Sequence, residues 1–188
     1  DRFAPQKLAT MAPLAKVHGL VSCAISVSTK DGKVLRTVGQ GPDRTLGPGD
    51  YKFVNFSMDS MLVYDRDRID PRFDPSLPCL TDLDFLLKLF AAIPACHHVG
   101  TPLHDYVKLA VSVSNGPGVT GKMIATKRLL RERLASGHYR LADPAGIVGI
   151  DRFLALSLEA EERFDPLTGP TGPLFEDNIE PLLRDDPR

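Results

Sequence analysis

Cysteine and histidine side chains are the first candidates for chemistry in this chain. A thiol hydrolase needs a cysteine thiolate beside a histidine base, and a helix N-terminus favours the thiolate. Cys79 lies just before a predicted helix, and either His104 or His138 would supply the base. The alternative interpretation is a buried apolar cysteine, because free cysteine is among the most buried residue types.

A nucleophile placed at the start of a helix is similar to the arrangement in papain-like viral proteases. The resemblance rests on Cys79 and the helix after it, and it implies a cysteine-protease nucleophile at that position. The local sequence Leu77-Pro78-Cys79-Leu80 departs from the small or aromatic neighbours of that family. A serine–lysine pair is a further alternative, with Ser57 or Ser60 as nucleophile and Lys127 among the candidate bases.

A glycine-rich segment between a predicted strand and a predicted helix is the second candidate site. Glycines let backbone amides surround a phosphate, and a lysine can reach its outer oxygens. The candidate residues are Gly116, Gly118, Thr120, Gly121 and Lys122. The segment resembles the Walker A motif of P-loop proteins, which implies nucleotide binding, although Met123 stands where that family has Ser or Thr. The alternatives are simple anion binding and a turn capped by Thr120.

Metal-capable side chains gather at Cys96, His97, His98 and His104. A structural zinc ion needs four ligands that converge tetrahedrally, and adjacent histidines do not easily face one ion. Cys79 is separated from this cluster by the predicted helix 81–93, which spans about 20 Å. We therefore interpret the cluster as a polar loop and predict neither a metal site nor a cofactor.

Positive charge is concentrated in one predicted helix, residues 122–135. Its basic residues are Lys122, Lys127, Arg128, Arg131 and Arg133. Glu132 is the one acidic residue there, whereas residues 151–188 hold ten acidic residues and four arginines. This asymmetry leaves three interpretations open: pairing within the chain, head-to-tail assembly, or an acidic partner such as anionic lipid or RNA.

The overall composition predicts a single globular domain. The chain has 188 residues, of which 43% are hydrophobic and 25% charged, and its net charge of −1 argues against a uniformly basic nucleic-acid binder. Its apolar runs are too short for a transmembrane segment. Three irregularly spaced cysteines favour a reducing compartment, cytoplasmic or nuclear. We expect an N-terminal arm at 1–18, one domain at 19–163 and a proline-rich acidic tail at 164–188.

Alternating apolar and polar residues predict the strands that position these candidates. Alternation over 21–28, the Asp31-Gly32 pair and the segment 34–38 together predict a β-hairpin. Further strands are expected over 51–64 and 106–114, and 147–160 favours a strand narrowly over a helix. Two helices are expected, one opening at Thr81 and one after Thr120. The pattern predicts an α+β fold with a mainly antiparallel, one-sided sheet and irregular ends rich in proline and glycine.

Since no candidate site combines several complementary groups at a fixed spacing, the leading hypothesis is a non-catalytic interaction or assembly module. Its partner would be a second copy of the chain or another protein. The order strand, charged loop, helix, strand and glycine-rich turn resembles that of rhabdovirus matrix proteins. This resemblance implies a viral structural protein that self-associates and bridges a nucleocapsid and a membrane.

Overall fold

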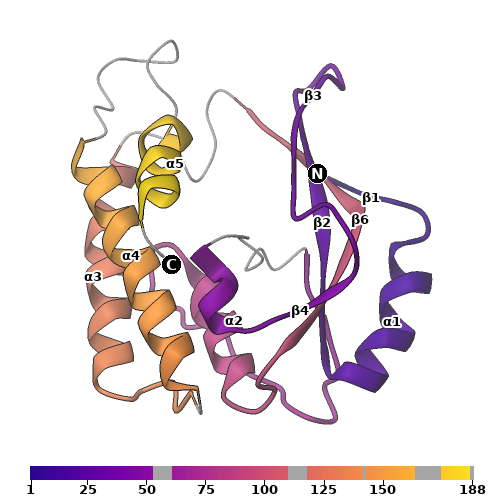
Figure 1. Ribbon diagram of the computed structural model, residues 1–188, viewed down its shortest axis with the longest axis horizontal. Coiled ribbons are helices and arrows are strands. Elements are labelled where there is room, and N and C mark those ends of the chain that lie inside the picture. Colours follow the sequence, from indigo (N-terminus) through magenta and orange to yellow (C-terminus); the bar gives the residue numbers. More distant parts are fainter. Residues whose placement is uncertain (53–60, 110–117, 142, 164–174, 187–188) are drawn as a thin grey trace.

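The protein has a mixed α/β fold in a computed structural model that describes residues 1–52, 61–109, 118–141, 143–163 and 175–186 (Figure 1). The described strands are β1 (Arg2–Phe3), β2 (Leu20–Ser28), β3 (Val34–Val38), β4 (Arg44–Leu46), β5 (Val63–Tyr64) and β6 (Cys96–Val107). The described α-helices are α1 (Lys7–His18), α2 (Thr81–Phe90), α3 (Val119–Ala135), α4 (Pro144–Arg163) and α5 (Phe175–Asp185), and η1 (Pro48–Lys52) is a 3-10 helix.

The sheet is mixed, which corrects the expectation of a mainly antiparallel sheet. Its central order is β1-β6-β2-β3, with β4 paired to β6 and β5 paired to β2. The predicted hairpin is confirmed, since β2 and β3 pair antiparallel. However, the two longest strands, β2 and β6, run parallel. Parallel neighbours need a crossover connection, and the segment that contains α2 supplies it.

The sheet carries helices on both of its faces, whereas the sequence pattern suggested one buried face. On one side, Met11 and Ala15 of α1 pack against Val21 and Cys23 of β2. On the other side, Ile25 and Val27 of the same strand join the larger core, together with α2, α3 and α4. The β2–β6 register shifts between Cys23 and Ile25, so the alternating residues of β2 divide between the two faces. Figure 1 shows α1 and α2 on opposite sides of the sheet.

Residues 147–160 belong to α4, so the narrow preference for a strand there was wrong. Ile150, Leu154, Ser157 and Glu161 are all buried and follow helical spacing. The alternation of Leu154, Leu156 and Leu158 that favoured a strand is produced instead by a helix with a wide buried face. The sequence of this segment fits both the two-residue period of a strand and the 3.6-residue period of a helix. Packing of α4 against α3, α5 and η1 favours the helix.

Both ends of the chain contain helices where irregular segments were expected. Residues 7–18 form α1, and Gly19 ends it with a positive φ of 86°. The sequence signal for α1 is weak because Pro13 lies inside the helix and Leu8 and Val17 are exposed. Within the predicted tail, residues 175–185 form α5, whereas residues 164–174 lie outside the described part of the chain.

The two helices predicted to open near Thr81 and Thr120 are present, but neither has the expected hydroxyl cap. Leu80 and Gly118 occupy the N-cap positions, both with positive φ, and no side-chain cap hydrogen bond is formed at either end. The strand expected over 106–114 begins earlier, at Cys96, and is described as far as Val107; residues 110–114 are outside the described ranges. Of the strand expected over 51–64, only Val63–Tyr64 is described as a strand.

None of the helices in the described ranges is long and apolar enough to cross a lipid bilayer.

Candidate functional site

Cys79 packs against α3, away from both histidines that were considered as its base. Its thiol donates a hydrogen bond to the Thr126 hydroxyl, with 3.2 Å between sulfur and oxygen. The His104 ring packs against Phe3, and its Nε2 lies 3.8 Å from an Asp1 carboxylate oxygen. The exposed His138 ring contacts Tyr139. Burial raises the pKa of the Cys79 thiol, which disfavours the thiolate that a nucleophile needs.

Beside Cys79, a buried ion pair joins α3 and α4. The Lys127 ammonium lies 2.8 Å from a Glu161 carboxylate oxygen and 3.2 Å from the Ser157 carbonyl oxygen. It also sits over the Phe175 ring of α5, 4.6 Å from the centroid. Burial lowers the pKa of Lys127, opposed by Glu161. Because Lys127 shares helical spacing with the buried Leu130 and Leu134, its burial was detectable in the sequence.

The glycine-rich candidate is only partly described. Gly116 lies outside the described residues, and Gly118 is the N-cap of α3 with φ of 76°. Thr120, Gly121 and Lys122 follow in the first turn of the helix, with Gly121 and Lys122 exposed. β6 is described as a strand only to Val107, and residues 110–117, which connect it to this turn, lie outside the described ranges. Nothing in the described part of this segment distinguishes a phosphate site from an ordinary helix start.

The metal-capable cluster lies on strand β6 rather than in a loop, and the strand separates its members. Cys96 is buried in the larger core, whereas the His97 ring stacks on His18 with 4.3 Å between centroids. His98 lies within 2.7 Å of the Ser22 hydroxyl and 2.8 Å of the Gly39 carbonyl oxygen. Within the described ranges, no group of three or more histidine, cysteine or acidic residues is placed to hold a metal ion.

His98 has a structural role that its contacts define. A carbonyl oxygen only accepts hydrogen bonds, so Nε2 donates to Gly39 and Nδ1 accepts from the Ser22 hydroxyl. Both side chains are fully buried, and burial lowers the pKa of His98. The neutral imidazole therefore connects β2, β6 and the segment before β4. It resembles a serine–histidine pair in composition, but neither group reaches solvent.

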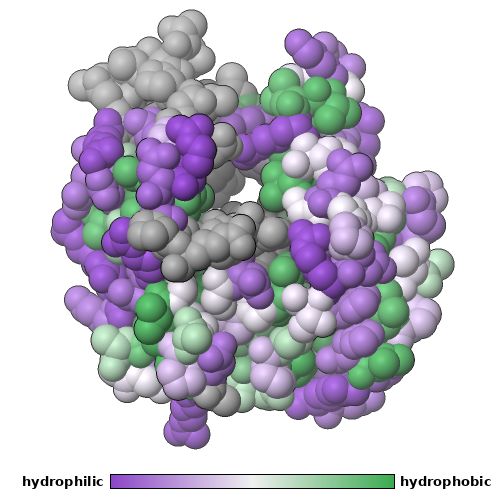
Figure 2. All heavy atoms as spheres, viewed as in Figure 1, coloured by the Kyte–Doolittle hydropathy of each residue, from purple (hydrophilic) through white to green (hydrophobic). Residues whose placement is uncertain are grey.

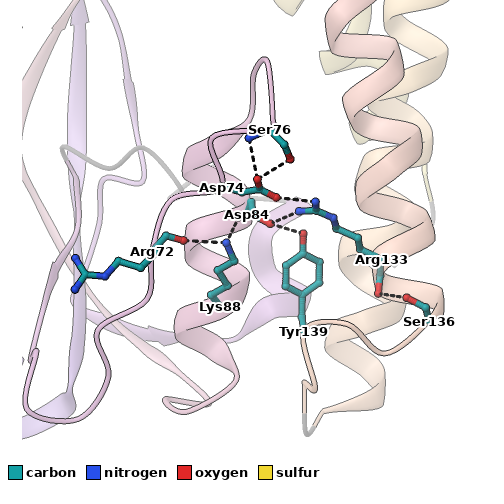
Figure 3. Close-up of polar contacts among 8 residues, drawn as sticks. All are labelled: Arg72, Asp74, Ser76, Asp84, Lys88, Arg133, Ser136 and Tyr139. Carbon is teal, nitrogen blue, oxygen red and sulfur yellow. Dashed lines mark hydrogen bonds and ion pairs between the residues drawn. The ribbon is translucent and has the colours of Figure 1, made fainter.

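A polar network around Asp84 fastens α2 to the end of α3 (Figure 3). The fully buried Asp84 carboxylate accepts hydrogen bonds from Arg133 at 2.9 Å and from the Tyr139 hydroxyl at 2.8 Å. Lys88 lies 2.6 Å from its other oxygen. Arg133 extends to Asp74 at 2.7 Å. The pKa of Tyr139 is raised mainly by burial and further by the adjacent Asp84 carboxylate. The hydroxyl therefore stays protonated and acts as a hydrogen-bond donor.

Most of the cations of the basic helix α3 pair with carboxylates of the same chain. Arg131 binds Asp151 of α4 through two hydrogen bonds of 2.7 and 3.0 Å, and Arg128 binds Glu162 at 3.1 Å. Together with Lys127 and Arg133, four of the five basic side chains pair with carboxylates of the same chain. These contacts favour pairing within the chain among the three interpretations of the charge asymmetry. Lys122 remains on the exposed surface.

A further group of exposed cations lies on the β2–β3 hairpin. Residues 30–36 are all exposed, and they include Lys30, Lys33 and Arg36 beside Val34 and Leu35. Val34 is 58% exposed and Leu35 is 48% exposed. Figure 1 shows the hairpin extending past the helices, and Figure 2 shows hydrophobic surface over β3 below a hydrophilic tip. We call residues 30–36 the hairpin surface.

The hairpin itself was predicted from the sequence, but its surface was not. Gly32 takes a φ of 88° in the turn, and the backbone of Thr29 hydrogen-bonds that of Lys33 across it. One signal was available: Val34 and Leu35 are adjacent, and neighbouring side chains of a strand point to opposite faces. At least one of these apolar side chains must therefore face away from a one-sided core.

Comparisons with models of protein families, with curated proteins and with solved structures found no match for this chain.

Proposed function

We propose that this protein is a non-catalytic interaction module that binds an acidic partner through the hairpin surface. The observation that supports this most directly is the run of seven exposed residues at 30–36, in which three cations flank two aliphatic side chains. Among the described residues, no ion pair involves the side chain of Lys30 or Lys33. Their charge is therefore available to a partner.

The buried polar clusters also support a binding role. Each group that resembles catalytic machinery holds secondary structure elements together: Cys79 contacts Thr126, and Lys127 pairs with Glu161. Such groups are the first place to seek acid–base or nucleophilic chemistry. Because the Cys79 thiol has a raised pKa, the thiol hydrolase is the less favoured alternative.

The charges on β3 favour an acidic partner over a second copy of the chain. β3 is at the end of the central strand order, so it is an edge strand of the described sheet. Lysine and arginine on an edge strand oppose pairing with an identical strand, because like charges would lie close together. An edge strand that carries Arg36, with Lys33 in the turn just before it, therefore suits a negatively charged surface better than a second copy of itself.

Retention on a polyanionic resin, eluted with a salt gradient, tests this proposal. We expect the native protein to be retained at low salt and Lys33→Glu to elute at a lower salt concentration. Lys122→Glu is the matched control, since it makes the same charge change at an exposed position on α3. Equal losses in both variants would mean that net charge governs retention, and no retention of the native protein would refute the proposal.

A further inference from the structure

We infer that the acidic partner is the surface of an anionic lipid bilayer, into which the apolar side chains of the hairpin surface insert. This inference rests on the proposed function, because it names the partner of the same surface. Its starting point is the combination of exposed charge and exposed hydrocarbon on one projecting element.

The apolar half of the argument concerns Val34 and Leu35. They are adjacent on β3 and point to opposite faces, yet both are about half exposed because the hairpin extends past the helices (Figure 1). Neither side chain belongs to the two buried clusters of the protein. An acidic partner that offered only charge would leave this hydrocarbon in water, whereas a bilayer interface receives it.

The end of β6 extends the same surface. The Lys108 amide donates a hydrogen bond of 2.7 Å to the Ser28 carbonyl oxygen, and Ser28 pairs with Val34 across the hairpin. Lys108 and Leu109 therefore lie beside the turn end of the hairpin, and Leu109 is 47% exposed. They repeat the pairing of a cation with an aliphatic side chain at this end of the sheet.

The chemistry of the hairpin favours lipid over nucleic acid. Single-stranded nucleic acid is held by aromatic side chains that stack on the bases, and residues 29–38 contain none. A duplex would engage Lys30 and Lys33 through its phosphates, but it would offer nothing to Val34 and Leu35. An anionic bilayer supplies both negative headgroups and an apolar interior within reach of one hairpin.

Vesicle co-sedimentation separates the two contributions. The probes are vesicles of phosphatidylcholine with phosphatidylserine and vesicles of phosphatidylcholine alone. We expect the native protein to sediment with the anionic vesicles only. Replacing one lysine of the hairpin by a neutral residue should weaken binding about fivefold. Val34→Ser/Leu35→Ser should weaken it on the order of tenfold, since it removes the inserted hydrocarbon.

The same apolar variant on the polyanionic resin distinguishes the possible failures. We expect Val34→Ser/Leu35→Ser to bind anionic vesicles on the order of tenfold more weakly while it keeps resin retention, because its charge is unchanged. If the native protein ignores anionic vesicles but still shows retention that depends on Lys33, the lipid inference is wrong and the proposed function stands. If the native protein neither binds anionic vesicles nor is retained on the resin, both the lipid inference and the proposed function are wrong.

Two further results would overturn the lipid inference. Unchanged vesicle binding by Val34→Ser/Leu35→Ser would exclude insertion of these side chains. Binding of a single-stranded RNA that depends on Lys33, without vesicle binding, would assign the hairpin surface to nucleic acid. Thermal unfolding of each variant checks its fold, and we expect no large shift because the substituted side chains are exposed.

Discussion

The basic helix α3 and the β2–β3 hairpin carry similar runs of positive charge, but the fold uses them in opposite ways. On α3, Lys127, Arg131 and Arg133 are directed at carboxylates of α4, α2 and the segment before α2. On the hairpin, Lys30 and Lys33 project into solvent. A count of charges therefore does not locate a binding surface until the pairing of each charge is known.

Packing explains the difference. α3 packs against α4, and near its end Arg133 reaches Asp84 of α2, so its cations lie beside acidic residues of both helices. The hairpin extends past every described helix, and the nearby Asp31 is engaged in a hydrogen bond from the Thr29 hydroxyl (Figure 1). Removing an α3 cation should thus affect stability, whereas removing a hairpin cation should affect binding.

The largest effect is expected at Lys127. Lys127→Met leaves the Glu161 carboxylate buried without its partner, and breaking a buried pair in this way costs about 3–5 kcal/mol. The double variant Lys127→Met/Glu161→Leu should recover most of the loss, because it removes both charges. Urea unfolding of the three proteins measures these free energies. A single variant as stable as the native protein would contradict the role assigned to this pair.

The contact between Asp74 and Arg133 of α3 should make the stability of the protein depend on pH in the acid range. Hydrogen bonds from the Ser76 hydroxyl and, to a smaller extent, from Arg133 hold the pKa of Asp74 well below its ordinary value. A carboxyl whose folded pKa is depressed stabilises the fold above its unfolded pKa, and this contribution is lost as pH falls through the folded value. Asp74→Asn should be less stable at neutral pH and lose less stability on acidification.

The melting temperature measured from neutral pH into the acid range tests the Asp74 prediction. Asp67→Asn provides the control, since Asp67 has an 88% exposed side chain and an ion pair with Lys16 at the surface. Identical pH profiles for Asp74→Asn and the native protein would be inconsistent with a stabilising carboxylate at Asp74.

A smaller effect is expected at Arg131. Its pair with Asp151 has two hydrogen bonds, but both side chains are more than one third exposed. Exposed pairs contribute about 0.2–1 kcal/mol, and salt screens them. Arg131→Ala should lower the urea midpoint slightly at low salt and less at high salt. A loss as large as that of Lys127→Met would remove the distinction between buried and exposed pairs on α3.

The smallest effect on stability is expected on the hairpin. Lys33→Glu should change the free energy of unfolding by no more than about 0.5 kcal/mol, because the side chain is exposed and no partner for it is seen in the described part of the chain. Urea unfolding beside the resin experiment checks this. A strongly destabilised variant would show that the hairpin, like α3, contributes its charge to the fold.

Several elements followed from local sequence. The alternation over 21–28, with Asp31-Gly32 in the turn, correctly predicted the hairpin, and the apolar stripe after Thr81 correctly predicted α2. The candidate sites were less predictable. His97 and His98 are adjacent in the sequence, yet strand geometry sends one to His18 and the other to Ser22. Whether adjacent metal-capable side chains converge depends on the secondary structure that carries them. The sequence predicted a loop around His97 and His98, whereas the structure places both on strand β6.

By itself, the sequence determined the hairpin, α2 and α3, because hydrophobic periodicity and turn residues act over a few residues. The tertiary structure alone decided the parallel pairing of β2 with β6, the helical state of 147–160, and which cations face carboxylates. These features depend on contacts between residues far apart in the chain, and such contacts leave no local pattern. Cys79, His97 and His98 all make contacts within the fold, and the exposed hairpin is the surface proposed for binding.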